Sequence, residues 1–146
     1  MNQPLLHIVL IALGGVAIAV QAPINSALGR TLASPLAAAT VSFGVGFAAL
    51  LVLSLVSGDG ALARVMGAPA WQLAGGLLGA FYIWVMVSGI SSLGALTAIA
   101  TLIFGQLAAA LLVDHLGAFG LAAQPVSLQR LLAVALVGAG LVLSRL

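Results

Sequence analysis

The sequence contains almost no charge. No lysine and no glutamate occurs among its 146 residues; four arginines, two aspartates and two histidines are the whole ionic inventory. Charged residues make up 4% of the chain and hydrophobic residues 64%. A water-soluble domain has about a quarter of its residues charged, so this chain cannot cover a soluble surface. We identify it as an integral membrane protein that contacts the lipid bilayer directly.

Cysteine is also absent, which excludes disulfides and thiolate metal sites. The basic pI reflects the scarcity of acids and does not point to nucleic acid. The chain contains no HExxH, P-loop or GxGxxG motif, and its Ser, His and Asp residues suit no nucleophilic chemistry. We therefore predict no enzyme activity, no metal and no cofactor. No signal peptide is expected, because the first apolar run lacks a basic leading region and a cleavage site.

Long apolar runs, in contrast, fill the sequence. A helix needs about 20 mainly apolar residues to cross a bilayer. We predict one transmembrane domain over residues 1–146, an all-α bundle of five helices. The predicted helices are 5–32 (kinked at Pro23), 35–57, 71–89, 94–113 and 128–145. The uncharged stretch 71–113 is too long for one span, so we predict a turn at 88–94, where Ser and Gly cluster.

The positions of the four arginines favour neither orientation of the chain in the membrane. Five spans would place the two termini on opposite faces. Arg64 and Arg130 would then share the face of the N-terminus, and Arg30 and Arg145 would share the other. The positive-inside rule compares the number of basic residues on the two faces. Each face would have two arginines, so the rule favours neither orientation. Either one arginine or the N-terminal amine sets the orientation, or the chain inserts both ways and antiparallel copies pair. We favour the second hypothesis.

Three amide side chains lie away from the ends of the predicted spans. Lipid offers no partner to an amide, or to a carbonyl released by Pro23, so such groups face other helices or a water-filled cavity. Gln21 and Asn25 are four residues apart and share a helix face, while Gln106 lies near the middle of the fourth span. We predict that all three line a solute path. Alternatively, the first two cap the carbonyls near the proline, and Gln106 bonds the first helix.

Other candidates are less specific. Tyr82 and Trp84 lie mid-span and form either an aromatic wall of the path or ordinary core. Asp114 and His115 are the only adjacent acid and imidazole; they form a proton or ion relay, or mark a hydrated helix end. Arg30 is an interface anchor, or a charge that attracts anions toward the path. The helix hinge is predicted at Pro23, Gly14 and Gly15.

Three segments (20–47, 91–121 and 129–143) resemble the YdcZ-type inner-membrane proteins, a short exporter branch of the drug/metabolite transporter superfamily. The most specific patterns are QxxIN, from Gln21 to Asn25, and GQxxxxxxxDHxG over 105–117. The resemblance implies a multi-pass protein of the bacterial inner membrane. It also implies half of a ten-helix inverted-repeat assembly, completed by a second copy or a paired paralogue. Unlike proton-coupled short multidrug transporters, the chain has no carboxylate in its first span.

The sequence thus predicts a transporter that exports a small molecule, a drug or a metabolite. It would act as a dimer by alternating access, rocking around a site near the midplane. Two alternatives remain open. A channel or passive pore needs no coupling carboxylate, and a non-transporting accessory membrane subunit needs no solute at all.

Overall fold

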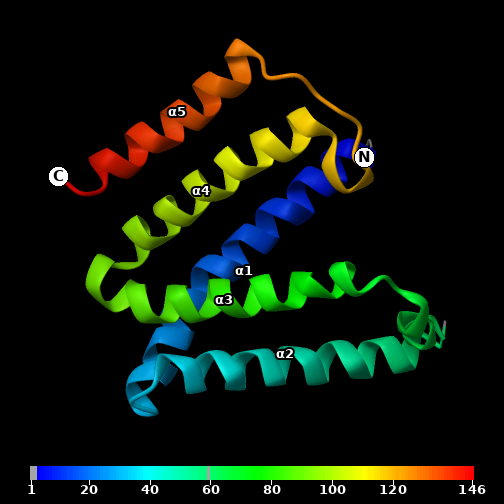
Figure 1. Ribbon diagram of the computed structural model, residues 1–146. Helices are drawn as coiled ribbons and strands as arrows, with labels where there is room; N and C mark the ends of the chain where they lie inside the picture. Colours follow the sequence, from blue (N-terminus) through cyan, green and yellow to red (C-terminus); the bar gives the residue numbers. More distant parts are fainter. Residues whose placement is uncertain (1–2, 59) are drawn as a thin grey trace. The chain divides into compact units, whose positions relative to one another are not determined.

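The structure, a computed structural model, describes residues 3–58 and 60–146, with side chains from residue 4 onward. Within these ranges the chain is helical and contains no strand. It divides into two compact units, Met1–Ser91 and Ser92–Leu146, here called the N-terminal and C-terminal units. Figure 1 shows the helices of each unit, and each unit is described by itself.

The helices are bounded as follows. The N-terminal unit contains α1 (Gln3–Thr31), α2 (Pro35–Ser57), the short 3-10 helix η1 (Ala61–Gly67) and nearly all of α3 (Ala70–Leu93). The C-terminal unit contains α4 (Ala95–Leu116), the 3-10 turn η2 (Ala118–Gly120) and α5 (Leu128–Leu143). Among the described residues, α1 to α4 are long and apolar enough to cross a membrane, whereas α5 has 16 residues. The count of five spans therefore stays a prediction.

The connection between α1 and α2 is a tight turn. The Ser34 amide donates to the Gly29 carbonyl at 3.0 Å and closes the end of α1. The Ser34 hydroxyl then accepts from the Ala37 amide at 3.1 Å, as an N-cap does. Pro35 occupies the first turn of α2, where no backbone N–H is required. This turn makes α1 and α2 consecutive neighbours.

One helix end differs from the sequence-based expectation, and one predicted kink is not tested. α1 continues through Pro23 without interruption, so the kink predicted there stays a prediction. α3 runs to Leu93, and Gly94 alone separates it from α4, so the turn is much narrower than the predicted 88–94. Gly94 has a φ of 78°, which favours glycine. The Ser88 hydroxyl donates to the Trp84 carbonyl at 2.7 Å and so bonds within the helix.

The N-terminal unit packs around small residues of α1 and α2. Its core consists of Ala38 and Ala39 from α2 and Ile83 and Val87 from α3, with Leu28 and Tyr82 packed against it. A Cβ atom placed on Gly29 would lie 3.0 Å from Val87 Cγ1, so α1 touches α3 closely there. α2 and α3 meet locally at this core, through the first turns of α2 and the second half of α3. Small residues allow this approach, as is usual between membrane helices.

The C-terminal unit is an antiparallel hairpin of α4 and α5 (Figure 1). The Phe104 ring of α4 covers Gly138 of α5, where a Cβ atom would meet the ring at 2.9 Å. Gly117 ends α4 with a φ of 59°, and a Cβ atom there would crowd the Leu121 carbonyl oxygen at 3.2 Å. The hairpin is therefore held by close contact along its length and by a glycine that reverses the chain.

Most long apolar side chains point outward in the described helices. Ile11 is 75% exposed, Leu77 75% and Leu136 72%, and these three come from different helices. In water such a surface would be unfavourable at about 25 cal/mol per Å² of apolar area. In a bilayer the same side chains meet lipid tails, so the exposed surface fits the membrane class inferred from composition.

Candidate functional site

Asn25 is the most unusual polar residue of the N-terminal unit. Its side chain is 4% exposed, and its Nδ2 group has no hydrogen-bond partner among the described residues. It lies on a buried seam of α1 formed by positions i, i+3, i+4 and i+7, namely Ala22, Asn25, Ser26 and Gly29. Buried polar groups are almost always paired. The Asn25 amide is therefore a donor for which the described chain supplies no acceptor.

Ser26 and Arg30 extend this polar region toward the end of α1. Ser26 is 5% exposed, and its Oγ atom accepts a hydrogen bond from Arg30 Nη1 at 3.1 Å. A serine hydroxyl can accept and donate at the same time, so Ser26 still has a proton to offer. Arg30 itself is exposed, in the last turn of the helix. The C-terminal half of α1 thus presents three donor side chains in succession.

Gln21 lies one turn before Asn25, beside a groove between α1 and α2. Its Nε2 atom donates to Ser42 Oγ at 3.5 Å, the long limit for such a bond. The groove has a volume of about 360 Å³. Its lining residues are Gln21, Ser42, Phe43, Gly46, Phe47 and Leu50. The groove is therefore apolar and aromatic, with one amide and one hydroxyl at its edge.

Neither amide of the first helix caps a carbonyl near Pro23 in the described structure. The Gln21 amide bonds a hydroxyl of α2, and Asn25 Nδ2 bonds nothing. The alternative in which both amides serve only the backbone around the proline therefore gains no support. The prediction that both residues line a path stays a prediction.

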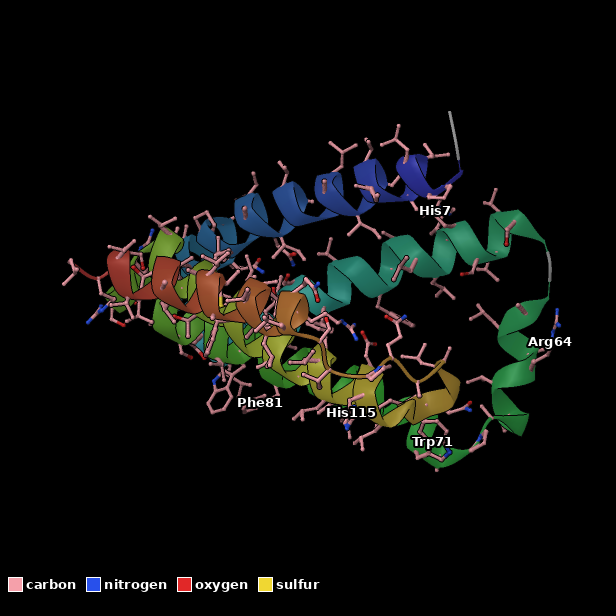
Figure 2. All side chains as sticks on the ribbon, turned by 90° about the horizontal axis from the view of Figure 1, so that it is seen from above. His7, Arg64, Trp71, Phe81 and His115 are labelled. Atoms are coloured by element: carbon pink, nitrogen blue, oxygen red, sulfur yellow. The ribbon has the colours of Figure 1, made fainter. Side chains whose placement is uncertain are left out.

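The two predicted aromatic residues of α3 lie in different surroundings. Tyr82 is half-buried and packs against the core of the N-terminal unit. Trp84 is 44% exposed, and its ring meets the edge of Phe81 with centroids 6.3 Å apart. Figure 2 labels Phe81 on the outer side of α3. The prediction that Tyr82 and Trp84 form an aromatic wall of the path stays a prediction.

The C-terminal unit holds the remaining candidates. Gln106 is exposed on α4, and so is His115 near the end of that helix (Figure 2). The Asp114 carboxylate forms an ion pair with Arg130 Nη2, and both side chains are 30% exposed. Arg130 Nη1 also donates to the Gln124 carbonyl at 3.2 Å. The acid predicted to act with His115 is thus paired with an arginine of α5.

The backbone of Asp114 also holds the loop between α4 and α5. The Asp114 carbonyl accepts from the Gln124 amide at 2.7 Å and from the Gly117 amide at 3.2 Å. A shallow groove of about 220 Å³ between the two helices includes Asp114 and Arg130 in its lining. Among residues 4–58 and 60–146, no three His, Asp or Glu side chains come together as metal ligands would.

Three features of the candidate site were not predicted from the sequence: Ser26, Ser42 and the ion pair of Arg130 with Asp114. Ser26 follows Asn25 directly, and a serine next to a buried amide on a membrane helix is itself a polar signal. The Arg130 pairing could have been inferred from scarcity, since a chain with two acids has few partners for an arginine. Ser42 carried no such signal, because its role depends on which face α2 turns to α1.

A protein-family model described as "Putative inner membrane exporter, YdcZ" matches residues 6–143. The chain belongs to the YdcZ family. The match covers nearly the whole chain, and it confirms the family predicted from the QxxIN and GQxxxxxxxDHxG patterns. The family description is that of a membrane transport protein rather than an enzyme. No curated protein and no solved structure matches this YdcZ-family chain.

Proposed function

We propose that this YdcZ-family chain exports a small solute across the bacterial inner membrane, along a path that Asn25 lines. The observation that carries the proposal is the buried Asn25 amide, whose Nδ2 group has no partner in the described chain. α1 has 29 residues and is about 43 Å long, which exceeds the ~30 Å hydrocarbon core. Asn25 lies about 9 Å from the end of α1, which would put it just inside that core in a helix centred on the bilayer, at a depth where polar groups mark solute paths.

The proposal includes further side chains, each within its own unit. In the N-terminal unit Gln21 would contribute an amide, and Tyr82 and Trp84 apolar surface. In the C-terminal unit Gln106 would contribute an amide. Pro23, Gly14 and Gly15 would form the hinge that lets α1 bend during alternating access. Both glycines have open space where a Cβ atom would be, so close packing does not explain them. The Asp114 carboxylate is engaged by Arg130 and would mark a hydrated end of α4; a proton or ion relay through Asp114 and His115 would require this ion pair to open.

α5 would be a fifth span despite its 16 residues. Its N-terminal end is tied to α4 by the ion pair of Arg130 with Asp114. Just past its C-terminal end, the Ser144 hydroxyl donates to Thr97 Oγ1 at 3.3 Å, and Thr97 donates to the Ser144 carbonyl at 3.2 Å. Thr97 and Asp114 lie about 26 Å apart along α4 at ~1.5 Å per residue. Both ends of α5 therefore follow α4 across most of the bilayer.

Five spans would put the termini on opposite faces and balance the four arginines. Antiparallel insertion of two copies, or of one copy and a paired paralogue, would then build the ten-helix arrangement of the drug/metabolite transporter superfamily. Cysteines can report the topology because the chain has none of its own. Ala63→Cys and Leu146→Cys replace exposed residues and leave every arginine in place. We expect both to be labelled from both sides of the membrane in cells.

Other labelling patterns would change this topology. Labelling of each cysteine from one side only, on opposite faces, would mean five spans with a single orientation. Labelling of both cysteines from the same side would mean four spans. Either result would remove the antiparallel pair and leave the exporter proposal to stand on the path residues.

Transport is tested with the purified protein in proteoliposomes and a panel of radiolabelled amphiphilic metabolites. We expect saturable uptake with counterflow for at least one solute, and its loss in Asn25→Leu. Ile24→Leu is the matched control, because Ile24 neighbours Asn25 and is 60% exposed. Equal flux in the two variants would contradict the role of Asn25.

A passive pore is the second candidate. A pore needs no carboxylate to couple transport to an ion gradient. Asp114 is the only acid on a described helix, and its carboxylate is already paired with Arg130, which favours this candidate. A pore would give flux that does not saturate and shows no counterflow. An accessory subunit would give no flux in any lipid.

A further inference from the structure

The polar side chains in the second half of α1 are hydrogen-bond donors without an anionic partner. Asn25 Nδ2 is buried and has no hydrogen-bond partner among the residues that the structure describes. The Arg30 guanidinium donates only to the neutral Ser26 hydroxyl among the described residues. Residues 1–58 contain no aspartate and no glutamate, so neither α1 nor α2 can supply a carboxylate. The second half of α1 therefore has one full positive charge and one amide donor that no described carboxylate balances.

We propose that the solute of this transporter carries an anionic oxygen group of carboxylate type, which Arg30 captures and Asn25 receives. This inference rests on the proposed export function. Arg30 lies in the last turn of α1, where a spanning helix leaves the bilayer, and Asn25 lies about 7.5 Å back along the helix. A guanidinium matches the two oxygens of a carboxylate, and its charge-assisted bonds are about twice as strong as neutral ones. Ser26 follows Asn25 in the sequence, accepts from Arg30 and has its own proton to give.

Helix dipoles do not reverse this charge. The C-terminal end of α1 carries a partial charge of about −0.5, which would repel an anion. The N-terminal end of α2 carries about +0.5 and begins four residues after Thr31, at Pro35. The two ends meet at the same turn and largely offset each other. The full charge of Arg30 therefore decides the sign of the potential at this end of the N-terminal unit.

The groove beside Gln21 indicates the rest of the ligand. Gln21 precedes Asn25 by one helical turn, and the groove walls include Phe43, Phe47 and Leu50. Apolar walls beside a few donors suit a ligand with an apolar body and one polar head. The structure therefore favours a small amphiphilic acid, aromatic or branched, over a sugar or an organic cation.

The test compares two probes of nearly equal shape, phenylacetate and its neutral amide, phenylacetamide. Binding is measured by calorimetry on the full chain in a neutral detergent. We expect the carboxylate to bind about tenfold more tightly, the factor that one charge-assisted hydrogen bond supplies. Arg30→Gln should abolish this preference. Equal binding of both probes by the wild type, or an unchanged preference in Arg30→Gln, would overturn the proposal.

Arg64→Gln is the matched control. Arg64 belongs to the same unit, is exposed on η1, and points away from the helices of that unit in Figure 2. Its replacement removes the same charge, so a general effect of net charge would lower the preference equally in both variants. Preserved preference in Arg64→Gln supports a local site at Arg30. An equal loss in both variants would contradict it.

A lipid phosphate offers the same anionic chemistry as a carboxylate, so the lipid is tested separately. The titration is repeated in bicelles of neutral phosphatidylcholine, and again with phosphatidylglycerol added. Phenylacetate binding in the neutral bicelles supports a solute site. Binding of phosphatidylglycerol with no binding of phenylacetate would make Arg30 a lipid anchor and overturn the proposal.

Transport and charge selectivity can fail independently. Asn25-dependent flux of neutral solutes alone would leave export in place and remove the anion site. Arg30-dependent binding of phenylacetate, with no flux of any solute, would leave the anion site and remove export.

Discussion

Replacing Asn25 with leucine separates function from stability. Leucine branches at the same carbon as asparagine and has a similar size, so it fits the seam between Ala22 and Gly29 without a large change in packing. The substitution removes the Nδ2 group, which is buried and has no partner in the described chain. If Asn25 is kept for the solute and not for the fold, the variant should be more stable and inactive.

The expected gain follows from the burial of Asn25, which is 4% exposed. A buried unpaired donor costs about 1–3 kcal/mol relative to an apolar group of the same shape. The membrane-embedded unfolded state also finds partners for polar groups, which lowers measured effects toward ~0.6 kcal/mol. We therefore expect Asn25→Leu to raise the free energy of unfolding by about 1–2 kcal/mol.

The assay is unfolding by a denaturing detergent, followed by tryptophan fluorescence in mixed micelles. The chain has two tryptophans, Trp71 and Trp84, and both lie on α3 in the N-terminal unit. The signal therefore reports the unit that contains Asn25. The control Ile24→Leu changes an exposed residue and should shift the free energy by less than ~0.5 kcal/mol.

One result would refute this reasoning. If Asn25→Leu lowered the free energy of unfolding by 1 kcal/mol or more and flux remained, the amide would be a structural group. Its partner would then be supplied by the assembled dimer rather than by a solute.

Two further predictions concern the C-terminal unit. Gly138→Val should destabilise the hairpin by about 2 kcal/mol through overpacking, because a Cβ atom there meets Phe104 at 2.9 Å. Hydrogen exchange of α4 and α5 measures the loss of stability. Gly140 has open space around its Cβ position, so the control Gly140→Val should lower the stability clearly less. Asp114→Asn should lower stability by at most ~1 kcal/mol, because both partners of its ion pair with Arg130 are 30% exposed. It should speed exchange in residues 118–127 and leave flux intact, whereas loss of flux at equal stability would assign Asp114 to an ion relay.

The sequence predicts the start of a helix where a single side chain or a proline determines it. Ser34 and Pro35 start α2 because a hydroxyl caps an amide and a proline needs no bond there. The turn predicted at 88–94 was too wide, because serine and glycine usually break helices and five of these seven residues are serine or glycine. In this environment the Ser88 hydroxyl bonds its own helix at the Trp84 carbonyl, and only Gly94 leaves helical geometry.

The amides show why the candidate site could be predicted only in part. In the sequence, Asn25 and Gln106 are equivalent polar residues within apolar runs. In the structure the first is buried on the seam of α1, and the second is exposed on α4. Burial depends on which helix face meets a neighbour, and runs that are apolar on every side do not encode that face by periodicity.

The sequence by itself determined the membrane class, the long helices and the family, because 4% charge and apolar runs of span length leave few alternatives. Only the tertiary structure decided that Asn25 Nδ2 is buried with no partner among the described residues, and that Asp114 pairs with Arg130. These facts depend on distances between side chains on helices of almost uniform composition. Small residues set those distances by letting the helices approach, and a count of residues along one chain does not contain them.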